Sequence, residues 1–203
     1  QVIAVAADHD TYVVNAELNP NHVPEFPYDS WDKAATDIQS AIEAAGAGHT
    51  VWVSNGVYGI TEQISVTNDV TVKSVCGRAA TEIRRVNLDK SSKKIIQRVA
   101  YVNNRKARVD GFTLACGRNR YETDVAGYYP ASGSGLLIAR SGGVVSDCSI
   151  TNDCVAFAQF VPGCGVGIYG VDAVLTNCLV TGWYLNGTRC RGAGLSMTDG
   201  LVT

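Results

Sequence analysis

The chain has 203 residues, of which 46% are hydrophobic and 18% charged, and this composition excludes an intrinsically disordered protein. No apolar run approaches the roughly 18 residues that a membrane-spanning helix needs. The net charge of −2 is unevenly spread: residues 1–77 carry 2 basic and 10 acidic side chains, residues 78–120 carry 12 and 3, and residues 121–203 carry 3 and 6.

The first 49 residues are expected to form a loop-rich region with one helix. A short strand is expected at 11–14, and Pro20, Pro24 and Pro27 then interrupt regular structure. Ser30 or Asp32 is expected to cap the helix at its N-terminus. The apolar residues at helical spacing are Ala34, Ile38, Ala41, Ile42 and Ala45, and Gly46 and Gly48 end the helix.

From Thr50 onward the sequence consists of short β-strands separated by Gly, Asn, Asp and Ser. Two motifs recur in alternation. The first motif is found at 109–114 (VDGFTL), 145–150 (VSDCSI) and 175–180 (LTNCLV), and the second at 133–136 (GSGL), 165–168 (GVGI) and 192–195 (GAGL). A period of 30 residues separates Cys148 from Cys178. Such recurrence favours a solenoid over a β-sandwich, because each repeat buries its apolar face only by stacking on the next.

In this solenoid Phe112, Cys148 and Cys178 are expected to form one inward stack, and Leu114, Ile150 and Val180 a second. Asp147 and Asn177 are expected at a bend between strands, where their side chains bond backbone groups and stack from coil to coil. We therefore expect two regions, a loop and capping helix at 1–49 and a parallel β-helix at 50–203.

Motifs along most of the chain resemble the right-handed parallel β-helix repeat proteins of bacterial surface and secreted type, in the pectin-lyase-like superfamily. The resemblance rests on 27–31 (PYDSW), 34–42 (AATDIQSAI), 48–58 (GHTVWVSNGVY), 70–77 (VTVKSVCG) and 109–114 (VDGFTL). It implies an all-β fold whose N-terminal α-helix covers the open end of the solenoid. It also implies a secreted or cell-surface protein, from which a signal peptide has been removed ahead of Gln1.

The C-terminal segment 200–203 (GLVT) aligns with 173–176 (AVLT), so the sequence stops just before the next expected Asn-Cys pair. Solenoids normally finish with a capping element. We therefore expect either a fragment of a longer protein or self-association through this uncapped coil.

The basic segment is a candidate surface for an acidic glycan. Its candidate polyanion-binding residues are Arg84, Arg85, Lys93, Lys94, Arg105, Lys106, Arg108, Arg118 and Arg120. The resemblance implies that a lyase would use an Arg or Lys as base together with calcium, and that a hydrolase would use aspartates on adjacent coils. The acidic residues for either set are sparse, so no catalytic residue and no metal site is assigned, and calcium is expected only for a lyase.

The seven cysteines form no CxxC pair and no Cys/His group, which argues against structural zinc. Cys76 and Cys116 each precede a glycine after a strand and are a candidate disulfide pair, as are Cys164 and Cys190, with Cys154 as an alternative partner for Cys164. Cys148 and Cys178 are expected to be buried and unreactive.

The functional prediction is an extracellular, non-catalytic scaffold: a surface stalk, an adhesin or a self-assembling subunit. The alternative is a polysaccharide lyase or hydrolase acting on acidic glycans. Nucleic-acid binding is not expected, because the sequence contains no recognisable module for it.

Overall fold

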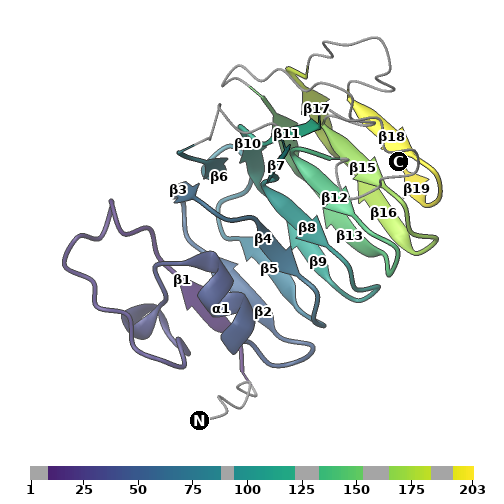
Figure 1. The fold of residues 1–203 in the computed structure, drawn as a ribbon. Coiled ribbons are helices and arrows are strands. Elements are labelled where there is room, and N and C mark those ends of the chain that lie inside the picture. Colours follow the sequence, from purple (N-terminus) through teal and green to yellow (C-terminus); the bar gives the residue numbers. More distant parts are fainter. Residues whose placement is uncertain (1–8, 88–93, 122–132, 153–164, 184–193) are drawn as a thin grey trace.

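The computed structural model describes residues 9–87, 94–121, 133–152, 165–183 and 194–203. It has the predicted fold, a right-handed parallel β-helix, in which the chain passes repeatedly through three parallel sheets (Figure 1). Each coil visits sheet A, then sheet B, then sheet C. The apolar side chains alternate along the short strands and point into the solenoid, as the period of two requires.

Sheet A has seven strands that all pair in parallel. They are β1 (Thr11–Val13), β2 (Thr50–Val53), β5 (Thr71–Ser74), β9 (Arg108–Asp110), β13 (Gly143–Ser146), β16 (Ala173–Thr176) and β19 (Leu201–Val202). The pairing of β1 with β2 brings a strand from the first 49 residues into the solenoid. At the other end, Leu201 and Val202 pair with Val174 and Leu175, in the register predicted from sequence.

Sheets B and C have five parallel strands each. Sheet B contains β3 (Gly56–Ile60), β6 (Thr81–Arg85), β10 (Thr113–Ala115), β14 (Ser149–Thr151) and β17 (Leu179–Thr181). Sheet C contains β4 (Ile64–Val66), β8 (Ala100–Val102), β12 (Leu136–Ile138), β15 (Val166–Ile168) and β18 (Leu195–Met197). A separate antiparallel pair, β7 (Lys94–Gln97) with β11 (Arg118–Tyr121), lies between sheets B and C in the chain order.

The first repeat motif is confirmed at the corner between sheets A and B. Val145 pairs with both Val109 and Leu175, and Ile150 pairs with both Leu114 and Val180. Gly111, Asp147 and Asn177 occupy the bend with φ of 81°, 53° and 50°, a conformation that Gly, Asp and Asn tolerate best. Asn177 Nδ2 donates a hydrogen bond to Asp147 Oδ1 on the preceding coil, so the predicted stacking of these side chains is also confirmed.

The predicted alignment of the second motif is wrong by two residues. Leu136 and Leu195 both pair with Val166, so Gly135, Gly165 and Gly194 are the equivalent positions, in place of Gly135, Gly167 and Gly194. The reason is an indole ring inside the solenoid: a Cβ on Gly135 or Gly165 would lie 2.9 Å from an atom of Trp183. Trp183 is itself buried and donates from Nε1 to the Ile150 carbonyl at 3.1 Å, so it packs in the core and is not a surface loop residue.

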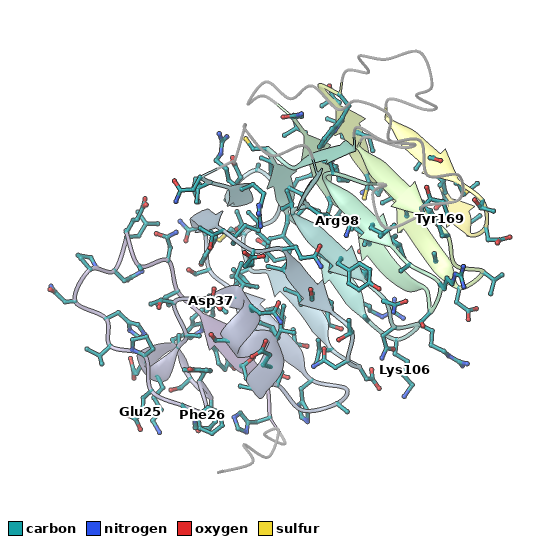
Figure 2. All side chains as sticks on the ribbon, viewed as in Figure 1. Glu25, Phe26, Asp37, Arg98, Lys106 and Tyr169 are labelled. Atoms are coloured by element: carbon teal, nitrogen blue, oxygen red, sulfur yellow. The ribbon has the colours of Figure 1, made fainter. Side chains whose placement is uncertain are left out.

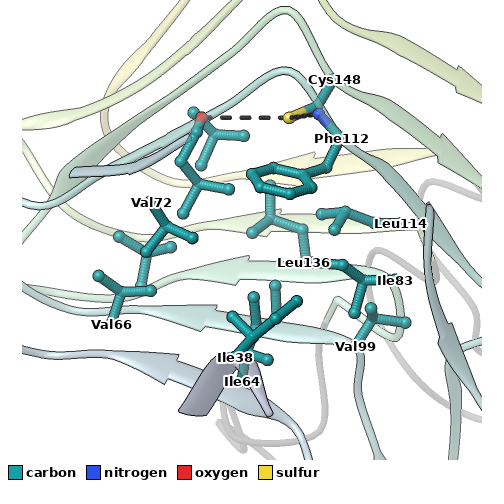
Figure 3. Packing of buried hydrophobic residues seen from close by; sticks show 14 of the residues in the cluster. Ile38, Ile64, Val66, Val72, Ile83, Val99, Phe112, Leu114, Leu136 and Cys148 are labelled. Carbon is teal, nitrogen blue, oxygen red and sulfur yellow. Dashed lines mark hydrogen bonds between the residues drawn. The ribbon is translucent and has the colours of Figure 1, made fainter. Parts of the chain in front are cut away.

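A single hydrophobic core fills the solenoid (Figure 3). Phe112, Leu114, Cys148 and Ile150 are fully buried, as predicted, whereas Cys178 in the last full coil is half-buried. In Figure 3 the Cys148 thiol lies beside Phe112, whose amide donates to the sulfur at 3.5 Å.

The N-terminal end of the solenoid is covered by α1 (Ile38–Ala44), as the resemblance implies (Figure 1). Three hydrogen bonds attach it to the first coils: Thr11 Oγ1 to the Ala41 carbonyl at 3.0 Å, Asn68 Nδ2 to the Ile42 carbonyl at 3.0 Å, and the Ser65 amide to Gln39 Oε1 at 2.8 Å. These bonds hold the helix over strand edges that would otherwise be exposed.

The predicted start of this helix is wrong. Residues Trp31–Lys33 form a separate 3₁₀ turn, and Asp37, rather than Ser30 or Asp32, caps α1 by accepting from the Ser40 amide at 2.8 Å. The helix cannot begin earlier because Ala35 is extended: its amide and carbonyl bond to Tyr12 and Val14 beside β1.

Candidate functional site

A continuous row of outward-facing side chains runs along sheet A, because its strands stack in register at about 4.8 Å per coil. From the N-terminal end, this outer row consists of Tyr12, Trp52, Lys73, Asp110, Ser146 and Thr176. All six side chains are half-buried, so one edge of each is open to solvent. The row therefore changes from aromatic to charged to hydroxyl-bearing over five coil steps.

The aromatic end of the row is held rigidly. The Tyr12 and Trp31 rings meet edge to face with centroids 4.8 Å apart, and Trp31 is 42% exposed. Trp52 Nε1 donates to Asp10 Oδ2 at 3.0 Å, and the Thr50 amide donates to Asp10 Oδ1 at 2.7 Å. Such partly open, oriented rings present an apolar face with polar groups at the edge, which suits the C–H face and hydroxyls of a sugar ring.

Asp10 anchors this end electrostatically. Burial opposes its ionisation, but hydrogen bonds from the Thr50 amide, the Trp52 indole and His49 outweigh burial and lower the pKa of Asp10. His49 Nδ1 lies 3.4 Å from Asp10 Oδ1. The aromatic end therefore carries a stable carboxylate at neutral pH.

The charged part of the row follows one strand further on. Lys73 Nζ lies 6.0 Å from the centroid of the Trp52 ring and 3.2 Å from Asp110 Oδ2. Ser146 Oγ donates to Asp110 Oδ1 at 3.2 Å. An aromatic ring, an ammonium group, a carboxylate and a hydroxyl therefore stand in sequence on four consecutive strands.

Arg108 stands beside this charged part. It pairs with Thr71 on β5, two residues along the strand from the Lys73–Asp110 pair, and its side chain is exposed. Within the part of the chain that the structure describes, Arg108 makes no ion pair. A guanidinium with five donors that is not engaged in such a pair is a ready partner for a carboxylate of a ligand.

The turn that leads into β9 adds further positive charge. Arg105 is exposed, and Lys106 Nζ lies 2.8 Å from Asp69 Oδ2 (Figure 2 shows Lys106 at this edge). This corner of sheet A contains four cations, Lys73, Arg105, Lys106 and Arg108, and two carboxylates, Asp69 and Asp110, a net charge of +2. We call these six residues the basic corner.

The nine basic residues predicted as one polyanion-binding group are distributed around the solenoid. Arg105, Lys106 and Arg108 belong to the basic corner. Arg84 lies on sheet B, where it forms an ion pair with Glu82, and Arg85 is buried. The backbone of the antiparallel pair carries Lys94, Arg118 and Arg120, and Lys93 lies outside the described residues. The group is divided because a coil visits three sheets within about 30 residues.

Two arginines, one of the nine and one outside them, differ from surface cations because they are buried. Burial lowers the pKa of Arg85, and the Glu62 carboxylate partly offsets this. An arginine that sequence reasoning missed, Arg98, is also buried: its Nε donates to the Gly133 carbonyl at 2.8 Å and its Nη1 to Gln63 Oε1 at 3.1 Å (Figure 2). Burial lowers the pKa of Arg98 to about 10, against the opposing effect of Tyr101 and Tyr169, so it is still charged at neutral pH. It ties together segments next to sheet C.

Sequence reasoning also missed Trp52, Lys73 and Asp110 as site residues. Asp110, Ser146 and Thr176 fall at equivalent positions of the first repeat motif, and extending that alignment to β5 and β2 would have added Lys73 and Trp52. The irregular segments between coils hid this extension.

The predicted Cys76–Cys116 disulfide is wrong, because Cys76 is an exposed free thiol. Cys76 follows β5 of sheet A, whereas Cys116 follows β10 of sheet B, so the two residues lie at different corners of the solenoid. Cys116 is buried and is not one of the free thiols. The predicted pair Cys164 and Cys190, and the alternative partner Cys154, lie outside the described residues.

Among the residues that the structure describes, no three His, Cys, Asp or Glu side chains are grouped as a metal site would need. None of the helices within the described ranges is both long and apolar enough to cross a membrane.

No protein-family model matches this sequence, and no curated protein matches it. Solved structures with a similar fold include pectin methylesterase in complex with hexasaccharide VII, with 15% identity, a TM-score of 0.45 and coverage of 85% of this chain and 55% of that one. A mutant pectin methylesterase in complex with hexasaccharide IV matches with 16% identity and a TM-score of 0.49 over 97% of this chain and 66% of the other. Pectin methylesterase PemA from Erwinia chrysanthemi matches with 16% identity and a TM-score of 0.45 over 85% and 55%.

The chain thus spans between about half and two thirds of the length of these structures, and the likeness concerns the fold. The predicted non-catalytic scaffold has no counterpart among these structures, all three of which are pectin methylesterases, and it is not carried further.

Proposed function

We propose that this protein is an extracellular enzyme that acts on an acidic polysaccharide, and that it holds the polysaccharide along the outer row of sheet A. The proposal that the polysaccharide binds along this row rests on one observation: Trp52, the Lys73–Asp110 pair and the exposed Arg108 lie together on neighbouring strands. Each of these groups has a chemical counterpart in a uronate chain.

The spacing of the row suits a linear glycan. Coils repeat at about 4.8 Å, so positions two coils apart are separated by about 10 Å, roughly the length of two sugar residues in an extended chain. One sugar packs against the open part of the Trp52 ring, and the hydroxyls of the next bond to Lys73, Asp110 and Ser146. Arg108 lies to one side of this line, where it pairs with a ring carboxylate.

The charge of the basic corner supports an acidic ligand over a neutral one. Its net charge of +2 stands in a protein whose net charge is −2, so a polyanion is attracted to this corner and not to the surface as a whole. The pairing of Lys73 with Asp110 and of Lys106 with Asp69 holds two cations in place without neutralising Arg105 and Arg108.

The binding part is tested with Arg108→Ala and a matched control, Arg84→Ala, which removes the same group from sheet B. Affinity for polygalacturonate, alginate and a neutral glucan is measured by titration calorimetry at low and at physiological ionic strength. We expect binding to the acidic polymers only, weakened about tenfold by Arg108→Ala and hardly by Arg84→Ala. If both substitutions weaken binding equally, the proposal that the polymer binds on sheet A is wrong.

The enzymatic part is tested separately on the same polymers, with and without methyl esterification. Formation of unsaturated products, new reducing ends and methanol distinguishes a lyase, a hydrolase and an esterase. Calcium and a chelator are included, because a lyase is expected to need the metal. Binding without any of these products would leave a glycan-binding protein and refute the enzyme.

A further inference from the structure

Two free thiols occupy equivalent positions in consecutive coils. Cys148 and Cys178 lie between the paired residues Ser146 and Thr176 on one side and Ser149 and Leu179 on the other. Equivalent residues on neighbouring parallel strands are about 4.8 Å apart, within the Cα separation of about 4.4–6.8 Å that a disulfide spans. The Cys148 amide already donates to Cys178 Sγ at 3.4 Å, so the Cys178 sulfur points toward the preceding coil.

The two thiols have different environments. Cys148 is fully buried, and a hydrogen bond with the Cys178 thiol together with burial raises its pKa. Cys178 is half-buried, and its pKa is lowered by the hydrogen bond with the Cys148 thiol and by the Cys148 amide. Burial and the Asp147 carboxylate oppose this lowering, and the Arg78 guanidinium adds a smaller lowering effect. One thiol therefore belongs to a half-buried residue and is inclined to ionise, and the other is fully buried in the preceding coil.

A cation is fixed beside Cys178. Arg78 Nη1 donates to the Asn177 carbonyl at 2.9 Å and contacts the Cys148 carbonyl at 3.4 Å. Thr113 Oγ1 donates to the Arg78 carbonyl at 2.7 Å and holds the base of this loop. Arg78 thus bridges the carbonyls of Asn177 and Cys148 in neighbouring coils and places positive charge near the site where a thiolate on Cys178 would form.

We propose that Cys148 and Cys178 form a reversible redox site, in which a small-molecule disulfide oxidises them to a bond that links the last two full coils. The Cys178 thiol loses its proton, and the thiolate attacks one sulfur of the small disulfide, which forms a mixed disulfide and releases one small thiolate. The Cys148 thiol then loses its proton and attacks the Cys178 sulfur, which closes the bond and releases the second small thiolate. Two cysteine thiols are oxidised and one disulfide is reduced to two thiols, so electrons and protons balance.

The bond would link the coil that contains β13 and β14 to the coil that contains β16 and β17. Closing a loop of 30 residues constrains the unfolded chain, and for a domain of this size we expect Tm to rise by about 5–10 °C.

The experiment uses the full chain with Cys76→Ser, which removes the exposed free thiol of Cys76 as a competing partner. Folded protein is incubated with oxidised glutathione or with dithiothreitol, alkylated and mapped by mass spectrometry, and its Tm is measured. We expect a peptide linked through Cys148 and Cys178 only after oxidation, and a higher Tm that dithiothreitol reverses. Cys178→Ser and Cys148→Ser each abolish both effects, with Cys178→Ser also abolishing the mixed disulfide.

Arg78→Met provides a kinetic readout that does not depend on the stability of the cysteine variants. This substitution is expected to slow the formation of the mixed disulfide at Cys178 several-fold at neutral pH. It is expected to have little effect on that rate at a pH where Cys178 is fully ionised. The proposal is overturned if the two cysteines stay unlinked in folded protein, if they link only in denaturant, or if the link leaves Tm unchanged.

Discussion

Lys73 Nζ lies 3.2 Å from Asp110 Oδ2 across neighbouring strands of sheet A. The side chains are 44% and 24% exposed, so solvent screens the pair and its contribution to folding stability is small. Its effect is positional: the carboxylate holds the ammonium group next to the Trp52 ring and keeps both at fixed places in the outer row.

Asp110→Asn is expected to strengthen binding of an acidic polysaccharide. The substitution keeps the size of the side chain but removes its negative charge. The carboxylates of the polymer then no longer compete with the Asp110 carboxylate for Lys73. We expect affinity to rise about two- to fivefold at low ionic strength and the gain to shrink as salt is added. Asp147→Asn is the matched control, because it makes the same charge change at the corner with sheet B in a conformation that Asn tolerates. A similar gain in both variants would show a general charge effect.

Gly135→Ala is expected to destabilise the protein, whereas Gly194→Ala at the equivalent position of a later coil is not. A Cβ on Gly135 would lie 2.4 Å from Ile150 Cγ2 and 2.9 Å from Trp183 Cζ2, whereas one on Gly194 meets only Val180 Cγ1 at 3.7 Å. We expect a loss of about 2–3 kcal/mol for Gly135→Ala and a change within about 0.5 kcal/mol for Gly194→Ala. Urea unfolding of both variants measures this difference, and equal losses would contradict the packing around Trp183.

Asp10→Asn is expected to change how stability depends on pH. The pKa of Asp10 is lowered in the folded protein, so its contribution is present above the unfolded value of about 3.9 and is lost as pH falls toward the folded value. Tm of the variant should lie below that of the unmodified protein at pH 7, and the two should converge in acid. Thermal unfolding of both proteins from neutral to acidic pH tests this. If the difference between their Tm values stays constant over this pH range, the ionised Asp10 carboxylate is not the source of the stabilisation.

Asp37→Ala is expected to cost about 1 kcal/mol, because it removes the side chain that caps α1 at the Ser40 amide. Asp32→Ala is the control, since Asp32 lies in the 3₁₀ turn ahead of the helix and is exposed. Chemical denaturation of the two variants distinguishes them. A larger loss of unfolding free energy for Asp32→Ala than for Asp37→Ala would instead support the helix start near Asp32 that was predicted from the sequence.

Much of the fold could be predicted from the sequence because its signals are local. The alternation of apolar and polar residues in short segments defines strands, and Gly111, Asp147 and Asn177 mark a bend that few other residues adopt. Where these signals recur at equal spacing, as at 109–114, 145–150 and 175–180, they also determine the register between coils. The parallel solenoid follows from that recurrence, whereas the division of each coil among three sheets is seen only in the structure.

Only the tertiary structure decided which residues become neighbours outside these repeats. The segments between sheets B and C differ in length from coil to coil, so regular spacing alone does not pair Trp52 with Lys73, and the repeat motif misaligns Gly135 with Gly167. The core settles the glycine register, because the Trp183 indole fits only where the side chains opposite it are absent. Winding around three sheets also separates residues that are close in sequence, such as Arg84 and Arg108, and brings Cys148 beside Cys178 across 30 residues.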